Sequence, residues 1–442
     1  MNTGSSTFFD VKCNYVQDEN LIIVIPKNDN DIKELNKNIL KKNLLLEYQE
    51  FIYKKSYLFV KEVKHRLDNS IGLNIKYKAN LLSNDRFDSF TIQGDEIDVF
   101  FSPIDYYFNC KKDSKYVARD LLYNKQIIDT FKFTYCKKDI YIYLYFGDIL
   151  AKGINSDLRL HPKLEVHFEA TNDIEFVYEI YNIIKKFLRF VCYKSELNLM
   201  PIDIYRNDGK KSRVGNLFEK EYKVKHYSKT SDINYTNFKL YINKILQLIA
   251  EDKDLYLRHL PRNENELFYY DVHRYLSCFA AFEYECNSKP ELFNQTDDEQ
   301  VENIRMDILG SIDNIDKKRL SGDEKSFLNQ AKDRICQLGT QFGQVKKITN
   351  AYDKMESIFC NTPYLIYGNK DVKVIAKELT ILRAKIAHNN YFEELTSDQI
   401  ENIRFLEILA YSMILKRAEI DDNGIELIIG SIFKCNYLYA GL

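Results

Sequence analysis

The sequence predicts an α+β protein of two domains, with a mainly antiparallel β domain and one long helix first, and an all-α bundle second. Runs of β-branched and aromatic residues dominate the first 170 residues, whereas helical spacing of apolar residues prevails from residue 233 onward. A basic segment containing two glycines lies between these parts at 206–229. We therefore place an N-terminal domain at 1–225 and a C-terminal domain at 233–442.

The strands of the N-terminal domain are predicted from short runs of β-branched and aromatic residues. These runs lie at 21–25, 90–93, 97–101, 140–146 and 164–168. Residues 94–96 contain Gly and Asp and separate the second run from the third, which predicts a β-hairpin. Residues 31–55 are the exception, because Leu, Lys and Glu predominate there and favour a helix.

A long helix is predicted at about 173–194, after the last of these strands. Asn172 stands three residues before Glu175, which is the spacing of a capping box. Apolar residues then recur at helical spacing, at Ile174, Val177, Ile184, Phe187 and Val191.

The segment 206–229 differs from both domains in its charge. It holds eight Lys or Arg residues against three acidic ones, a local net charge of +5. Gly209 and Gly215 predict that no regular element runs through it. Two interpretations remain open, a solvated linker and a basic loop that touches a nucleic-acid backbone.

The C-terminal domain is predicted to be helical throughout. Apolar stripes or helical patterns occur at 268–286, 298–310, 322–337, 344–360 and 375–386. Thr396 and Gln399 form a second capping box, which opens a helix from about 397 to 418.

Composition excludes several classes of protein. The formal net charge of −2 gives no global positive field that would attract nucleic acid, so such contacts must come from local patches. The nine cysteines show no zinc-ligand or redox spacing, and no metal or other cofactor is expected. No secretion signal or long apolar span is visible, so we expect a cytoplasmic protein without membrane contact.

Most catalytic motifs are missing from the chain. It has no phosphate-binding glycine loop, no nucleophile elbow and no zinc-protease helix motif. His161 and His167 lie on or beside a predicted strand, without partners at ligand spacing, and are expected to be structural.

One pair of residues could support chemistry. Arg383 and His388 are separated by four residues near the end of the apolar-striped helix. An imidazole can accept a proton from a ribose 2′-hydroxyl near neutral pH, and a guanidinium can stabilise the negative charge on the phosphate. On spacing alone, a surface Arg and a helix-terminal His are the simpler interpretation.

The context of this pair resembles the HEPN superfamily. The segment LTILRAKIAHNNYFEEL resembles the HEPN motif region, and RYLSCFAAFEYEC (274–286) resembles an earlier helix of that fold. The order of domains is similar to that of ApeA-type abortive-infection proteins. This resemblance implies a metal-independent RNA endonuclease with Arg383 and His388 as catalytic residues. Two departures are Ala384, where many members have a polar residue, and Tyr391, one position too late for a modified tyrosine.

Helix geometry favours a site shared by two chains. Five residues of regular helix rotate by about 140°, so Arg383 and His388 do not point the same way unless the helix ends before His388. Together with the resemblance, this favours a homodimer through the helical domain. Lys385 and Lys377 are candidates for RNA contacts in the groove between the two motifs, although exposed lysines usually serve solubility.

Two further residues are expected to support the catalytic pair. A buried acid on the helix at 274–286 could orient Arg383, and Glu283 is the candidate, whereas Glu285 is expected to face solvent. Asn389 directly follows His388 and is the other supporting residue.

These observations lead to one expected function and two alternatives. We expect an anti-phage ribonuclease that acts on tRNA or another structured RNA, with an N-terminal domain that senses a phage-derived trigger or restrains the nuclease. The first alternative is an inactive HEPN module that dimerises and binds RNA or a partner. The second is a ligand-binding β domain with the helices as a scaffold.

Overall fold

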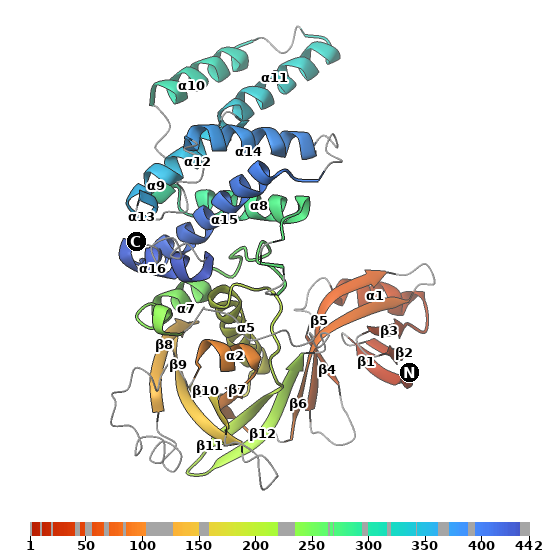
Figure 1. Ribbon diagram of the computed structural model, residues 1–442. Helices are drawn as coiled ribbons and strands as arrows, with labels where there is room; N and C mark the ends of the chain where they lie inside the picture. The colour runs from red at the N-terminus through yellow and green to blue at the C-terminus, as the bar shows by residue number, and fades with distance from the viewer. Residues whose placement is uncertain are drawn as a thin grey trace, which may run out of the picture. The chain divides into compact units, whose positions relative to one another are not determined.

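A computed structural model describes most of the chain as two units, each with its own core (Figure 1). The first unit comprises 1–192 and 196–251, and the second comprises 193–195 and 252–442. Residues outside the description are 1, 9–10, 19–20, 40–44, 49–54, 66–69, 83–84, 103–126, 150–158, 220–234, 264–265, 268, 294–298, 316–319, 342, 361–370, 388–393 and 434–442. The predicted division into a β-rich first part and a helical second part is confirmed.

The first unit is built on one sheet of twelve strands, all paired antiparallel. Its order is β1-β2-β3-β6-β12-β11-β7-β10-β9-β8, with β5 beside β6 and β4 beside β5. The strands are β1 (Asn2–Phe8), β2 (Val11–Asp18), β3 (Leu21–Ile25), β4 (Leu45–Tyr48), β5 (Lys55–His65), β6 (Ile71–Leu81), β7 (Phe87–Ile92), β8 (Ile127–Tyr135), β9 (Lys138–Ile149), β10 (Arg159–Thr171), β11 (Ile202–Asn207) and β12 (Lys211–Glu219). Four of the predicted runs lie in β3, β7, β9 and β10.

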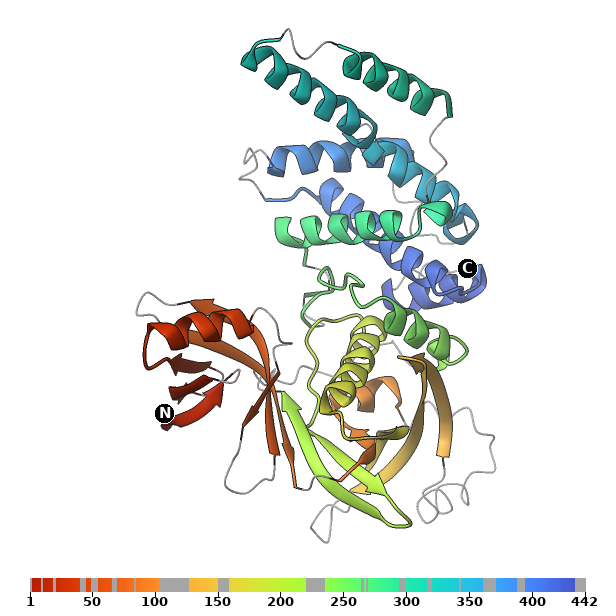
Figure 2. The same ribbon diagram turned by 180° about the vertical axis from the view of Figure 1, so that it is seen from behind.

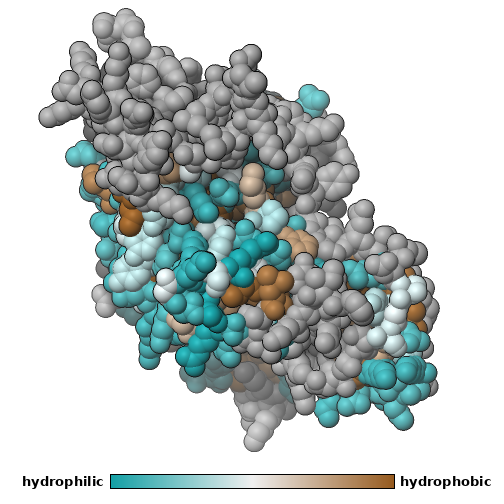
Figure 3. All heavy atoms as spheres, turned by 90° about the horizontal axis from the view of Figure 1, so that it is seen from below, coloured by the Kyte–Doolittle hydropathy of each residue, from teal (hydrophilic) through white to brown (hydrophobic). Residues whose placement is uncertain are grey.

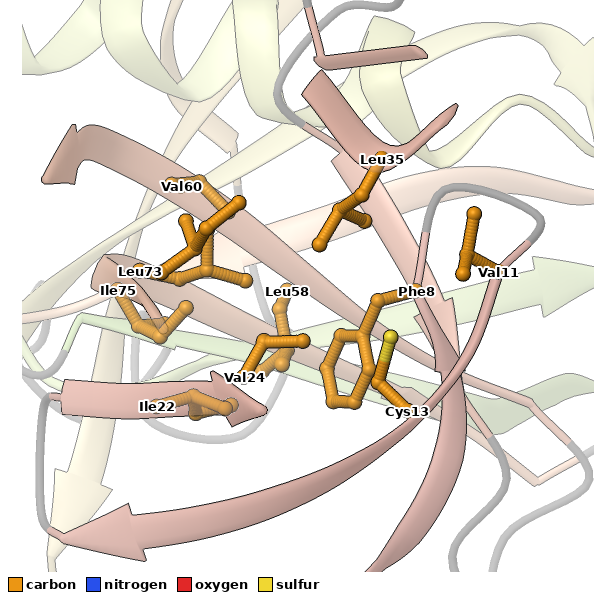
Figure 4. Close-up of a cluster of buried hydrophobic side chains, with 11 residues drawn as sticks. Phe8, Val11, Cys13, Ile22, Val24, Leu35, Leu58, Val60, Leu73 and Ile75 are labelled. Atoms are coloured by element: carbon orange, nitrogen blue, oxygen red, sulfur yellow. The ribbon is translucent and has the colours of Figure 1, made fainter. Parts of the chain in front are cut away.

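The N-terminal part of the sheet encloses a separate apolar cluster (Figure 4). Strands β1, β2, β3, β5 and β6 and helix α1 (Asp29–Ile39) contribute its side chains. The members labelled in the figure are Phe8, Val11, Cys13, Ile22, Val24, Leu35, Leu58, Val60, Leu73 and Ile75. The predicted single helix over 31–55 is wrong beyond Ile39, where α1 ends, because strand β4 and the start of strand β5 follow it.

The long helix α5 (Ile174–Val191) packs on the other part of the sheet (Figure 2). Phe176 meets Phe168 of β10 at a ring-centroid distance of 5.7 Å. The predicted helix is confirmed, but its capping residue differs. The Asp173 side chain, not Asn172, accepts hydrogen bonds from the amides of Glu175 and Phe176. Asp173 is the residue directly before the first helical position, where a side-chain oxygen reaches these amides.

The predicted hairpin at 90–101 is wrong. Residues after β7 form the short helix α2 (Asp95–Phe100), in which Ile97 and Phe100 are fully buried at a helical spacing of three. Gly94 precedes this helix with a φ of +158° and lies against backbone. A Cβ at Gly94 would come within 2.5 Å of the Asn198 carbonyl oxygen, so only glycine permits this approach.

The basic segment is a β-hairpin in its described part, not a loop or linker. Strands β11 and β12 pair from Ile202 to Leu217, and Gly209 occupies their turn with a φ of +84°. The predicted boundary near residue 225 lies outside the described residues. The next helices, α6 (Tyr235–Phe238) and α7 (Ile242–Glu251), belong to the first unit, since side chains of α7 accept hydrogen bonds from the backbone of β8.

Glu165 of β10 lies on the face of the sheet opposite α5, where its carboxylate contacts two basic side chains. Partial burial alone would raise its pKa, but hydrogen bonds from His167 and Lys211 lower the pKa of Glu165 to about 2. The folded state therefore binds this proton less tightly than the unfolded state, and the stabilisation is present above pH 4.5 and lost as the pH falls toward 2.

We accordingly expect Glu165→Gln to lower the free energy of unfolding by about 2 kcal/mol at pH 7 and by less at pH 3. Urea unfolding at the two pH values measures this difference. A destabilisation that is equal at both would contradict the assignment. The exposed Glu169→Gln, four residues along the same strand, serves as the control.

The described elements of the second unit are all helices. They are α8 (Val272–Ser288), α9 (Pro290–Phe293), α10 (Glu299–Asp313), α11 (Gly322–Gln341), α12 (Gly343–Asp353), α13 (Glu356–Cys360), α14 (Val372–Ala387), α15 (Ser397–Arg417) and α16 (Asp422–Phe433). Helix α15 is buried on nearly all sides, and both hydrogen bonds of the predicted capping box at Thr396 and Gln399 are present. Helices α8, α12, α14 and α16 pack against this central helix.

Candidate functional site

Helix α14 positions Arg383, the first residue of the predicted catalytic pair. Its buried face consists of Ile375, Ala376, Leu379 and Leu382, which follow helical spacing. Tyr275 of α8 donates a hydrogen bond of 2.6 Å to the carbonyl of Leu379. These contacts fix the helix around the position of Arg383, whose side chain remains 38% exposed.

Two residues of α8 contact the Arg383 guanidinium, and one residue of α12 contacts its carboxylate partner. Its Nη2 lies 2.9 Å from Oε2 of Glu283, and its carbon lies 4.7 Å from the centre of the Phe279 ring. Gln344 of α12 donates to the other carboxylate oxygen of Glu283. Gln344 is buried, so it fixes the Glu283 carboxylate on the side that faces the protein interior. Glu283 is a quarter exposed, and the Arg383 guanidinium still faces solvent.

The other predicted site residues are placed differently. Lys377 and Lys385 are on α14, and both are exposed. His388 and Asn389 lie outside the described residues, and helix α14 is described as far as Ala387. The structure therefore brings Arg383 and Glu283 together and leaves the partner histidine unplaced.

The expectation for Glu285 is wrong. This carboxylate is only 1% exposed, and its oxygens lie 2.8 Å from two nitrogens of Arg417. Burial raises the pKa of Glu285 to about 7, although Arg417 opposes the shift. Glu283 and Glu285 are two residues apart on a helix and so point about 200° apart, which places them on opposite sides of α8.

A second polar network, which sequence reasoning missed, is buried between α8 and α15. Arg274 pairs with Glu407 at 2.8 Å, and their side chains are 8% and 0% exposed. Tyr270 donates to the second oxygen of Glu407 at 2.7 Å and lies under the Arg274 guanidinium. A further nitrogen of Arg274 donates to backbone carbonyls, among them that of Tyr269. The signal was a lone Arg on the apolar stripe of α8 together with a Glu inside the apolar stretch of α15.

His161 and His167, which are expected to be structural, each have a carboxylate partner. His161 lies 2.8 Å from Asp98 of α2, and His167 lies 2.8 Å from Glu165. Their side chains are each 31% exposed. The pairing of His161 could not be predicted because Asp98 is 63 residues away in sequence.

Comparisons of the chain with models of protein families, with curated proteins and with solved structures give no match. Among the described residues, no group of His, Cys, Asp and Glu is arranged to hold a metal ion. None of the described helices is long and apolar enough to cross a membrane. The function is therefore inferred from the site around Arg383 and Glu283.

Proposed function

We propose that the protein is a metal-independent RNA endonuclease of the HEPN type that acts in abortive infection against phage. His388 serves as the general base toward the ribose 2′-hydroxyl, and Arg383 stabilises the charge of the five-coordinate phosphate. The observation that carries the proposal is the Arg383 guanidinium, held by Glu283 and Phe279 yet 38% exposed, on the helix that leads to His388.

The substrate and assembly are part of the same proposal. The RNA is a tRNA or another structured RNA, and Lys377 and Lys385 contribute positive charge from other faces of the helix that carries Arg383. Two chains associate through the helical unit, so that two motifs line one groove. The first unit restrains the nuclease until a phage-derived trigger binds.

The test is cleavage of a purified tRNA pool in the presence of EDTA. Fragments that end in a 2′,3′-cyclic phosphate are expected, because the 2′-oxygen is the nucleophile. One tRNA of this pool, made with a single 2′-deoxy residue at its cleavage position, should resist cleavage there. A requirement for magnesium, or cleavage of the deoxy strand at that position, contradicts this mechanism.

A second candidate, a non-catalytic module that dimerises and binds RNA, is favoured by the ion pair between Arg383 and Glu283, which offsets part of the guanidinium charge. RNA binding without any cleavage, unaffected by Arg383→Ala, would support this candidate instead.

Gln344 is proposed as a positioning residue for Arg383. Its hydrogen bond to Glu283 is made to a charged group, which is worth about 1.5 kcal/mol or more. If this energy orients the guanidinium in the transition state, Gln344→Met should lower kcat about tenfold at unchanged KM. Single-turnover cleavage over a range of RNA concentrations separates the two constants.

The matched control is Gln330→Met, at an exposed position of α11. Glu283→Gln should reproduce the loss in kcat, since it removes the charge that Gln344 holds. A fall in thermal stability without any change in kcat would assign Gln344 a purely structural role.

A further inference from the structure

We infer that the outer face of the sheet in the first unit binds single-stranded nucleic acid. The face is formed by β8, β9, β10, β7, β11 and β12, and on it aromatic rings are flanked by cations. The inference concerns binding by the first unit and does not rest on cleavage by the second.

The pairing register places one residue from each strand in a single row. Lys132 faces Tyr141, Tyr141 faces His167, and His167 faces Ser89. The row continues from Ser89 to Tyr205 and from Tyr205 to Arg213. Residues directly opposite each other in antiparallel strands point to the same face. The row spans about 24 Å, since neighbouring strands lie ~4.8 Å apart.

The side chains of this row lie on the face of the sheet opposite α5, and all of them except the buried Ser89 are at least partly exposed. Along β9, the residues Ile140, Ile142, Leu144 and Phe146 are buried, whereas Tyr141, Tyr143 and Tyr145 between them are partly exposed. On β10 the same alternation leaves His161, Lys163, Glu165 and His167 partly exposed. Because α5 packs against the buried side, the tyrosines lie on the opposite side, as a ligand-binding face requires.

The aromatic rings are arranged as a platform. Tyr141 and Tyr143 stand parallel, with an interplanar angle of 9° and ring centres 6.5 Å apart. His167 meets Tyr143 edge to face at 5.1 Å. Bases of a single strand stack on such rings without regard to sequence, because every base has a flat aromatic face.

Cations lie at both ends of this platform. Lys132 is 5.2 Å from the centre of the Tyr141 ring, and Lys211 is 4.3 Å from that of Tyr205. Arg213 is 50% exposed beside them. These last two belong to the β11–β12 hairpin, whose residues 202–219 hold four Lys or Arg against three acidic residues. The described residues that face the viewer in Figure 3 are mainly hydrophilic, with an apolar patch near the centre.

The carboxylates of this face are already paired. Asp139 pairs with Lys132, Glu165 with Lys211 and Asp203 with Arg213, at 2.7 to 2.8 Å. The pairs of Lys132 and Arg213 are exposed on both sides and therefore weak, so these two cations can turn to phosphates at little cost, whereas a phosphate must compete with Glu165 for Lys211. Rings that stack and cations that meet a backbone are the two components of single-strand binding.

The test uses the full chain carrying His388→Ala, so that RNA remains intact. Fluorescence anisotropy is measured with a labelled 12-nucleotide RNA strand, the same strand as DNA, and the RNA annealed to its complement. We expect the single strand to bind at least tenfold more tightly than the duplex. Binding of both RNA and DNA indicates stacking and phosphate contacts alone, whereas preference for RNA adds contacts to the 2′-hydroxyl.

Two sets of variants separate the contributions. Tyr141→Ala combined with Tyr143→Ala should raise Kd about tenfold or more. Lys211→Glu combined with Arg213→Glu should reduce the magnitude of the slope of log K against log salt by about 1.4, because each phosphate contact on a single strand contributes about 0.7. The control is Tyr269→Ala in the second unit, a tyrosine that is 64% exposed and should leave Kd unchanged.

Ultraviolet crosslinking keeps the inference testable if the tyrosine variants do not fold. The chain with an intact sheet should crosslink to the RNA strand through peptides of β9, β10 and the β11–β12 hairpin. Crosslinks confined to the second unit would overturn the inference. So would tighter binding of the duplex, or an unchanged Kd in the folded tyrosine double variant.

Discussion

The variant His388→Ala is expected to cleave RNA about a hundred- to ten-thousand-fold more slowly than the wild-type protein in EDTA. This range is what a general base contributes when it is positioned at the proton that it accepts. Arg383→Ala should cause a loss of similar size, because the guanidinium stabilises charge that is present only in the transition state. Single-turnover rates on one defined tRNA measure both effects.

The conservative variant Arg383→Lys distinguishes charge from geometry. A lysine keeps the positive charge but cannot engage two phosphate oxygens with a planar fork, so we expect only partial recovery. Lys373→Ala, at an exposed position near the start of the same helix, is the control and should leave the rate unchanged. Wild-type rates in both Arg383 variants would remove Arg383 from the mechanism.

A mixture of the two inactive variants tests whether the site is shared. If Arg383 of one chain acts with His388 of the other, mixed dimers of Arg383→Ala and His388→Ala contain an intact combination and recover part of the activity. Absence of recovery, with mixed dimers present, would place both residues of a site in one chain.

The variant Arg274→Met is expected to destabilise the helical unit by about 3–5 kcal/mol. The change leaves Glu407 at 0% exposure without its ionic partner, and an uncompensated buried charge costs this much. Urea unfolding at pH 7, followed by far-ultraviolet circular dichroism, measures the change in the transition of the helices.

Two further variants check the cause. Arg274→Met combined with Glu407→Leu removes both charges and should recover much of the loss, although Tyr270 then lacks its acceptor. Lys289→Met breaks an ion pair that is exposed on both sides and should change the stability by about 0.5 kcal/mol at most. A double variant less stable than Arg274→Met alone would contradict the account.

The long helices were predictable because their signals are local. In α15 the capping box and the apolar spacing lie within one segment of the chain, and both are present in the structure. Helix α5 followed from its apolar stripe alone, while its cap was placed one residue too early. For α2, six residues are too few to establish a period, so the apolar run at 97–101 was indistinguishable from a strand.

The sequence by itself determined the two-part architecture and the helix that carries Arg383. These conclusions rest on periodicity and capping, which act between neighbouring residues. Only the tertiary structure decided which groups meet across the chain. Glu283 lies 100 residues from Arg383, and Gln344 reaches it from a third helix.

The same reason applies to the first unit. The row from Lys132 to Arg213 exists only because five strand pairings share one register, and a shift of one residue in any strand would turn its side chain to the buried face. Local sequence determines how each strand alternates, and it does not specify which strands become neighbours. The neighbours of each strand are set by the packing of this part of the sheet against α5.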